Sequence, residues 1–201
     1  MELINILTRT GKRESYFKTL VASIESQTYK NFRHIKSNDN PDCTFLTDLP
    51  DVFNVSPDRN AGNGFYNLYL NHLAKQVQEG WVIILDDDSK LIDKTFLEKL
   101  AVICDNSEPP EILIYRSRIS ETGVIPRPEN MQRKIIEYGD IDMACFCIHS
   151  TVLPKYSFHA KRGGDYNLLD QLRSTNQYTF KFVTLPIGIS ANYDGAKHGD
   201  L

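Results

Sequence analysis

Three consecutive aspartates, Asp86, Asp87 and Asp88, are the residues of this sequence best suited to chemistry. Two carboxylates at about 4 Å repel by about 4 kcal/mol at an effective dielectric constant near 20, and a divalent cation would relieve that repulsion. Ligation by oxygen alone favours Mg²⁺ or Mn²⁺, which keep one or two protein carboxylates while substrate phosphates complete the coordination. The triplet therefore predicts a cation site, with a solvated acidic turn as the alternative.

The segment before the triplet, residues 81–85, is continuously apolar, which predicts a strand buried on both faces. In an open α/β sheet, ligands bind beyond the carboxyl ends of the strands, which is where the aspartates stand. Because side chains alternate along a strand, we expect Asp86 and Asp88 to converge on one side and Asp87 to point to the other.

Strands and helices alternate over the first half of the chain, which predicts an α/β domain with a largely parallel sheet. Apolar patterning predicts strands at residues 3–7, 33–37, 52–55, 81–85, 112–115, 143–149 and 180–183, and helices from residue 15 and at 65–77, 94–104 and 166–173. The stretch 117–139 contains glycine and two prolines and predicts a long mobile substrate loop.

The composition excludes several classes of protein. A chain of 201 residues fits one domain, and its net charge of -3 argues against a broad nucleic-acid surface. No apolar run is long enough for a transmembrane helix, and the start lacks the pattern of a secretory signal, which together predict a cytoplasmic protein. The four cysteines lack the spacing of zinc ligands and are expected to be buried thiols.

Three segments, INILTRTGKRESYFKTLVASIESQTYKNFRHIKSNDN, RNAGNGFYNLYLN and GWVIILDDDSKL, occur in an order and spacing similar to those of the GT-A glycosyltransferases, especially glycosyltransferase family 2. The resemblance implies the GT-A fold, a mixed, mostly parallel sheet flanked by helices, with residues 1–92 binding the nucleotide-sugar donor and 93–201 the acceptor. It implies transfer from a UDP-sugar to a saccharide or glycoprotein hydroxyl with Mn²⁺ or Mg²⁺. A narrower resemblance, to the amino-terminal glycosyltransferase domain of a chlorovirus capsid-glycosylating protein, would allow a rhamnose-type donor and retention of configuration.

The resemblance also assigns roles to residues of the first half. It implies that Thr8, Arg9, Thr10 and Asp39 surround the nucleobase of the donor and that Arg59, Asn60 and Gly62 flank the donor. It also implies that Asp86, at the ribose or the metal, and Asp87 bind the donor. Asp86 and Asp88 are the implied metal ligands. Glycines at 62 and 64 would let the backbone approach a ligand closely, although a Gly-Asn-Gly loop is also an ordinary turn.

In the second half, KRGGDYNLLDQL occupies the position of the acidic catalytic base of inverting family members, although Gly164 stands where glutamate is usual. Asp165 would accept the proton of the attacking acceptor hydroxyl, or it would merely cap the following helix. His198 is the implied third metal ligand, or a histidine of a loose tail. The aromatic residues Tyr115, Phe146 and Tyr166 would line an acceptor pocket or, more simply, pack in the core.

Two other functions stay open. A phosphatase of the haloacid-dehalogenase type also places aspartates after a strand, but after the first strand, and a non-catalytic nucleotide-sugar binder would use Asp165 only as a helix cap. An EF-hand calcium loop is excluded, because Lys90 and Leu91 stand where that loop needs glycine. A single aspartate does not decide between inversion and retention.

Overall fold

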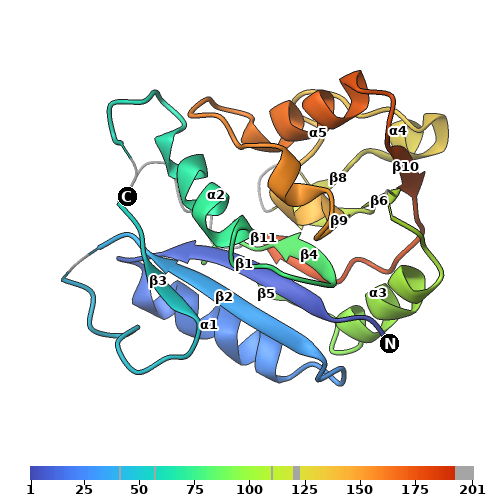
Figure 1. Ribbon diagram of the computed structural model, residues 1–201. Coiled ribbons are helices and arrows are strands. Elements are labelled where there is room, and N and C mark those ends of the chain that lie inside the picture. Colours follow the sequence, from blue (N-terminus) through green and yellow to red (C-terminus); the bar gives the residue numbers. More distant parts are fainter. Residues whose placement is uncertain (41, 57, 110, 120–122, 193–201) are drawn as a thin grey trace.

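A central seven-stranded sheet organises the chain in the computed structural model, which describes all residues except 41, 57, 110, 120–122 and 193–201 (Figure 1). The strands are, in spatial order, β10 (Thr179–Phe182), β6 (Glu111–Ile114), β9 (Phe146–His149), β4 (Trp81–Ile84), β1 (Ile4–Thr10), β2 (Phe32–Asn38) and β3 (Val52–Asn54). Strand β9 runs antiparallel to both neighbours, and the other pairs are parallel. The predicted mixed, mostly parallel sheet is confirmed.

Helices cover both faces of the sheet. They are α1 (Glu14–Glu25), α2 (Leu68–Ala74), α3 (Phe96–Asp105), α4 (Pro128–Arg133) and α5 (Gly164–Ser174), with short 3₁₀ helices η1 (Phe65–Asn67), η2 (Met143–Cys145) and η3 (Leu153–Lys155). In Figure 1, α1 and α2 lie on opposite sides of β1 and β2. Helix α1 buries Phe17, Leu20 and Ile24, three of the apolar positions whose helical spacing predicted it.

Strand β4 lies in the middle of the sheet and is buried throughout, as its continuous apolar sequence predicted. It enters from Gly80, whose φ of +80° suits glycine and where a Cβ would lie 2.3 Å from the carbonyl oxygen of Leu3. The strand ends at Ile84, and Ser89 N–H donates to the carbonyl of Asp86 at 2.9 Å, which closes a turn. The aspartate triplet therefore lies in that turn.

The prediction of a structureless loop over residues 117–139 is wrong. This stretch contains β7 (Ser117–Ile119), β8 (Gly123–Ile125) and α4, and the two strands join β5 (Lys90–Leu91) and β11 (Ile189–Ala191) in a second, four-stranded sheet. Each of these strands has three residues or fewer, and the parallel pairing of β7 with β11 joins segments far apart in sequence. Such strands carry no local pattern of alternation, so the sequence alone did not reveal them.

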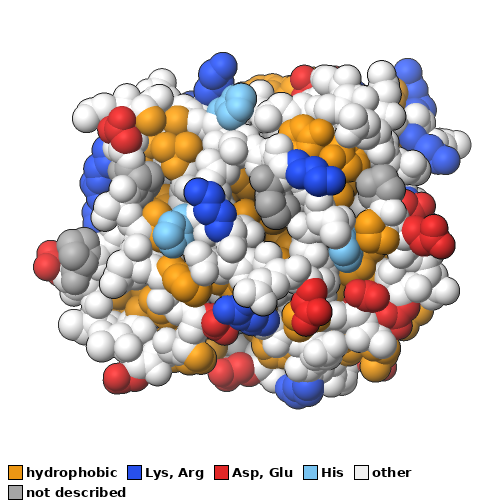
Figure 2. Space-filling model, viewed as in Figure 1, with side chains coloured by type: hydrophobic (Ala, Val, Ile, Leu, Met, Phe, Trp, Pro, Cys, Tyr) orange, Lys and Arg blue, Asp and Glu red, His pale blue; other side chains and the backbone are white. Residues whose placement is uncertain are grey.

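Two other predicted elements are shorter than expected. The helix expected over 65–77 begins as η1 and ends at Ala74, and the strand expected over 143–149 begins as η2 and becomes extended only at Phe146. Among the described residues, no helix combines the length and apolar character needed to cross a membrane. On the face in Figure 2, acidic and basic side chains are interspersed over the surface.

Candidate active site

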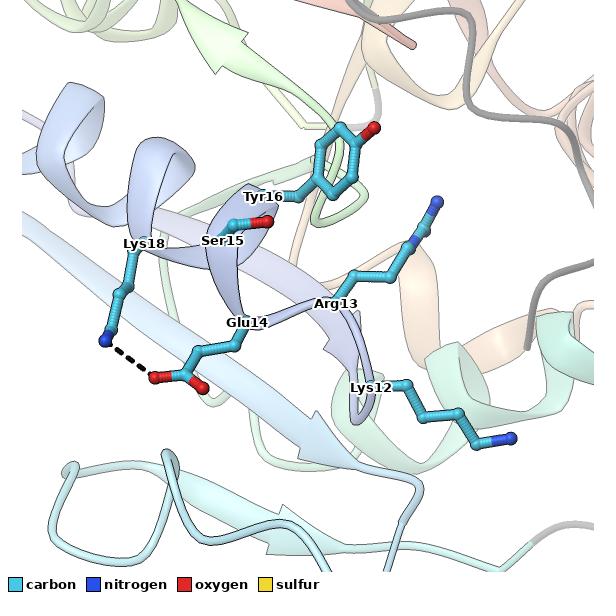
Figure 3. A pocket seen from close by; sticks show the side chains of 6 residues that line it. All are labelled: Lys12, Arg13, Glu14, Ser15, Tyr16 and Lys18. Carbon is cyan, nitrogen blue, oxygen red and sulfur yellow. Dashed lines mark ion pairs between the residues drawn. The ribbon is translucent and has the colours of Figure 1, made fainter.

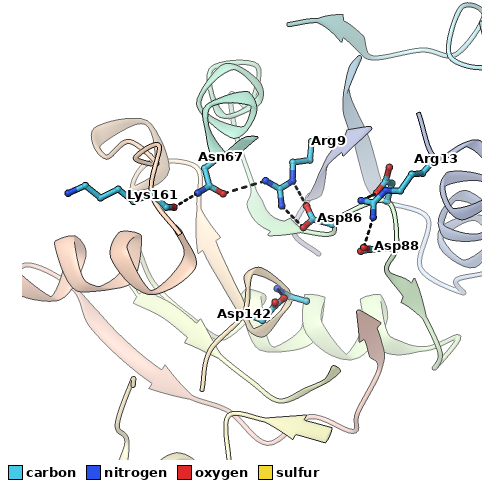
Figure 4. A network of polar contacts seen from close by, with 9 residues as sticks. Arg9, Arg13, Asn67, Asp86, Asp88, Asp142 and Lys161 are labelled. Atoms are coloured by element: carbon cyan, nitrogen blue, oxygen red, sulfur yellow. Dashed lines mark hydrogen bonds and ion pairs between the residues drawn. The ribbon is translucent and has the colours of Figure 1, made fainter. Parts of the chain in front are cut away.

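Arg9 and Asp86 form a bidentate ion pair at the carboxyl ends of β1 and β4 (Figure 4). Arg9 Nε donates to Asp86 Oδ1 at 2.7 Å, and Arg9 Nη2 donates to Asp86 Oδ2 at 2.6 Å. The guanidinium carbon of Arg9 also lies 4.6 Å from the centre of the Tyr66 ring, which is a cation-π distance. These contacts fix the orientation of the Asp86 carboxylate before any ligand binds.

Arg13 holds the other two carboxylates of the triplet. It extends from the start of α1 beside Lys12 and Tyr16 (Figure 3), and it donates to Asp88 Oδ2 at 2.9 Å and to Asp87 Oδ1. The strand ends at Ile84, so the side chains of the triplet need not alternate as they would along a strand, but Asp86 still lies close enough to Asp88 to raise its pKa. The repulsion within the triplet is met by two guanidinium groups.

The triplet still fits a divalent cation that takes few protein ligands. Asp88 Oδ1 is buried and has no hydrogen-bond partner, and burial together with the nearby Asp86 raises the pKa of Asp88. Within the described part of the chain, no group of three or more His, Cys, Asp or Glu side chains is arranged to hold a metal ion. Mg²⁺ and Mn²⁺ complete such a site with phosphate oxygens of a substrate. The predicted ligand His198 lies outside the described residues.

Asp39, the predicted nucleobase-binding residue, lies against Gly11 just after the end of β1. A Cβ on Gly11 would lie 1.6 Å from Asp39 Oδ1, so the carboxylate packs directly on this glycine. That oxygen is buried without a hydrogen-bond partner, and burial raises the pKa of Asp39 although the positive charges of Lys12, Arg59 and Arg9 lower it. A ligand that donates a hydrogen bond, as a nucleobase N–H does, would satisfy this oxygen.

The two threonines of the first strand do not reach this space. Thr8 is fully buried, and its hydroxyl lies 2.9 Å from Nε2 of His34, whose ring stacks on Phe17 of α1. Thr10 is also buried and donates from Oγ1 to Asp87 Oδ2 at 2.9 Å. Both hydroxyl groups are therefore engaged inside the protein, on the side of the sheet opposite to Arg9.

The segment 62–64 packs on the second half of the chain. Arg59 and Asn60 are exposed, but a Cβ on Gly62 would lie 2.3 Å from the carbonyl oxygen of Ala160, and one on Gly64 would lie 2.2 Å from that of Lys161. The close approach made possible by these glycines is therefore to the backbone of residues 160–161. The expectation of a close approach to a ligand is not what the structure shows.

Asn67 links the two halves of the chain beneath this loop, a role that the sequence did not reveal. Its Oδ1 accepts from Arg9 Nη1 at 3.4 Å, and its Nδ2 donates to the carbonyls of Lys161 at 2.8 Å and His159 at 3.3 Å (Figure 4). Asp86, Arg9 and Asn67 therefore form a continuous chain of polar contacts to the segment that precedes α5. Asp165 lies just beyond that segment, in the first turn of α5.

A cavity of about 430 Å³ lies between the carboxyl ends of β1 and β4 and the start of α5. The charged and polar residues of its lining include Arg9, Asn67, Asp86, Asp142, Arg162 and Asp165, and Gly163 also lines it. In Figure 4, Asp142 lies across from the Arg9–Asp86 pair, on the other half of the chain. The carboxylates of both halves thus face one space, which is large enough for part of a nucleotide-sugar.

Asp165 is not a helix cap, so that alternative is wrong. Gly163, with a φ of +69°, is the residue that precedes α5, and Asp165 accepts from the N–H of its neighbour Tyr166 at 2.7 Å. Burial, with the nearby Asp142 adding repulsion, raises the pKa of Asp165 to about 7. A carboxylate with such a pKa is suited to accept a proton near neutral pH.

Asp142 is a second acid of the cavity that the sequence analysis missed. Its Oδ1 accepts from the N–H of Ala144 at 2.9 Å and so caps η2. Burial raises the pKa of Asp142 to about 6, with the charges of Asp86 and Asp88 acting in the same direction. The expected core packing of Tyr115 and Phe146 is confirmed, since both are buried.

Solved structures with the same fold include glycosyltransferases. The structure of TarS 1–349 from S. aureus superimposes with a TM-score of 0.69 at 15% identity, over 95% of this chain and 60% of that chain. Its complex with UDP-GlcNAc gives 0.66 at 14% identity, over 95% and 58%. The mannosyltransferase PcManGT from Pyrobaculum calidifontis, in complex with GDP-Man and Mn²⁺, gives 0.60 at 13% identity, over 91% and 54%.

These comparisons show the fold, which is that of the GT-A glycosyltransferases. The chain spans about 60% of the length of the TarS structure and 54% of that of PcManGT. No protein-family model matches the sequence, and no curated protein matches it either. The matches give no support to the narrower resemblance to chlorovirus domains, which stays a prediction.

Proposed function

We propose that this chain is a glycosyltransferase that moves a sugar from a nucleoside-diphosphate donor, a UDP-sugar in the first instance, to a hydroxyl of a saccharide or glycoprotein. The observation that carries the proposal is the cavity in which Asp86, beside the end of β4, faces Asp165 at the start of α5. The fold supports it, because the solved structures of this fold include complexes with UDP, with UDP-GlcNAc and with GDP-Man and Mn²⁺.

In the proposed reaction Asp165 acts as the general base. It takes the proton of the acceptor hydroxyl while that oxygen forms a bond to the anomeric carbon and the bond from this carbon to the diphosphate oxygen breaks. The products are the glycosylated acceptor and the nucleoside diphosphate. A direct displacement of this kind inverts the configuration of the anomeric carbon.

The donor is proposed to lie along the carboxyl ends of β1, β2 and β4. Asp39 would accept from an N–H of the base, with Lys12 and Arg59 close by. Asp86 and Asp88 would hold Mn²⁺ or Mg²⁺, and the cation would offset negative charge on the leaving diphosphate. We further propose residues 1–92 as the donor half and 93–201 as the acceptor half.

Titration calorimetry with UDP, with and without Mn²⁺, tests the donor site directly. We expect binding that depends on the metal, and an absence of metal-dependent heat would refute the donor and cation assignments. Asp165→Asn tests the catalytic role, because it should abolish transfer while it leaves UDP binding unchanged. Asp170→Asn, an exposed change on the same helix, is the matched control.

The phosphatase alternative predicts a different arrangement and a different product. Its aspartates would follow the first strand, whereas the triplet here follows β4, the fourth strand along the chain. Release of inorganic phosphate from an aryl phosphate, in the absence of any acceptor, would favour that alternative over sugar transfer.

A further inference from the structure

Tyr138 is the most exposed aromatic side chain among the large hydrophobic residues of the described chain, with 63% of its surface accessible. It lies at the tip of a turn in which Asp140 N–H donates to the carbonyl of Glu137 at 3.1 Å and Gly139 adopts a φ of +80°. A single exposed aromatic residue is common on protein surfaces, so the meaning of this one depends on how it is held and on what lies beside it.

The turn that carries Tyr138 is held rigidly at both ends. The carboxylate of Glu137 accepts from Arg127 Nη2 at 2.7 Å and from Asn130 Nδ2 at 2.9 Å. The carboxylate of Asp140 accepts from the backbone N–H of Arg127 at 3.0 Å and from Asn130 Nδ2 at 2.7 Å. Because the turn is already ordered, little conformational entropy remains to be lost when a ligand contacts the ring.

The ring is also fixed next to the cavity. A Cβ on Gly163 would lie 2.5 Å from Tyr138 Cε2, so the ring packs on a glycine that lines the cavity. Tyr166 supports the ring in an edge-to-face contact, with centroids 5.6 Å apart and an interplanar angle of 85°. Gly163 and Tyr166 lie within two residues of Asp165, so the exposed ring stands beside the proposed base.

We propose that Tyr138 is a stacking platform for a pyranose ring of the acceptor, which it presents to Asp165. The inference rests on the proposed function and deepens it by assigning the acceptor side of the site. A pyranose has an apolar face of C–H groups that packs on an aromatic ring and a rim of hydroxyls that donates to carboxylates, here Asp142 and Asp165. The acceptor group in this proposal is therefore a saccharide, because a serine or threonine hydroxyl offers the ring no comparable apolar face.

Saturation-transfer NMR tests the assignment with methyl glycosides of glucose, galactose, mannose and N-acetylglucosamine, each added to the protein with saturating UDP and Mn²⁺. We expect at least one glycoside to bind, with the strongest saturation on the C–H protons of one ring face. Tyr138→Ala should weaken that binding about tenfold or more, which corresponds to about 1.4 kcal/mol. Tyr138→Phe and Tyr138→Trp should retain it, because stacking needs the ring and not the hydroxyl.

The matched control is Tyr178→Ala, which removes one ring of another edge-to-face tyrosine pair, with Tyr156 at 5.7 Å. It should leave glycoside binding unchanged. Calorimetry with UDP separates the two proposals: a wild-type protein that binds no UDP refutes the donor site, whatever the glycosides do. A protein that binds UDP but no glycoside of the panel, or a Tyr138→Ala variant that binds like the wild type, overturns the platform.

Discussion

Arg13→Met should destabilise the fold, because it removes the cation shared by two buried carboxylates. The side chains of Asp87 and Asp88 are 1% and 5% exposed, and that of Arg13 is 20% exposed. Loss of one partner from a buried ion pair costs about 3–5 kcal/mol. Since Arg13 is partly hydrated and Asp87 keeps the hydroxyl of Thr10, we expect the lower value, about 3 kcal/mol at pH 7.5.

The stability lost in Arg13→Met should be smaller at pH 5 than at pH 7.5. Burial raises the pKa of Asp87 to about 6 even though Arg13 lowers it. The folded state thus holds this proton more tightly than the unfolded state, so stability falls as the pH rises from about 4 through 6. Without Arg13 the pKa of Asp87 should rise further. At pH 5 the carboxyl is then largely protonated in both proteins, and the difference between them should shrink.

Urea unfolding at pH 7.5 and pH 5, with EDTA present, measures both effects. At a slope of about 2–3 kcal/mol/M, a loss of about 3 kcal/mol lowers the midpoint by about 1–1.5 M. Arg173→Met is the control, because its ion pair with Asp170 is about half exposed on both sides and should contribute less than about 1 kcal/mol. A variant as stable as this control, or a deficit that is the same at both pH values, would refute the reasoning.

Three further predictions concern the proposed site. Asp142→Asn should shift the acidic limb of the pH profile of kcat/KM, near 7 for Asp165, to lower pH because it removes a neighbouring negative charge. Asp88→Asn should weaken Mn²⁺-dependent UDP binding about tenfold or more by calorimetry, whereas Asp170→Asn should not. Gly64→Ala should lower the free energy of unfolding by about 1–3 kcal/mol in urea, since its Cβ would lie 2.2 Å from a carbonyl oxygen of the facing segment.

The parts of the fold that were predictable are those whose patterns are local. The continuous apolar run that became β4 and the helical spacing of α1 need no knowledge of what lies opposite them. The second sheet was missed because its strands have two or three residues and are defined by partners distant in sequence. The length of the connection 117–139 suggested a loop, whereas β7 within it pairs with β11 and with β8.

In the candidate site, too, only the local features were predictable from the sequence. The position of the aspartate triplet at the end of a buried strand followed from the sequence, but its partners did not, because Arg9 and Arg13 lie about 75 residues earlier. The resemblance pointed to Asp165, although its glycine neighbour differs from the usual glutamate. For Asp142 the sequence offered one indication, because this acidic residue directly precedes the buried stretch that contains β9. A residue before a strand lies at the site edge of the sheet only if that strand is antiparallel to its neighbours, and the sequence did not show the direction of β9.

Because β9 runs antiparallel to β4, the cavity receives carboxylates from both halves of the chain. The first residues of an antiparallel strand lie at the same edge of the sheet as the last residues of its parallel neighbours, so the approach to β9 brings Asp142 opposite Asp86.

The two sides of the cavity differ in their positive charge. Asp86 is paired with Arg9, whereas no ion pair involves Asp142 or Asp165 within the described part of the chain. Burial therefore acts on these last two carboxyls with little opposing charge, and their pKa values rise to about 6 and 7. One side of the cavity therefore presents a carboxylate held by a guanidinium group, and the other presents two carboxyls that exchange protons near neutral pH, which is the division of roles that the proposed sugar transfer needs.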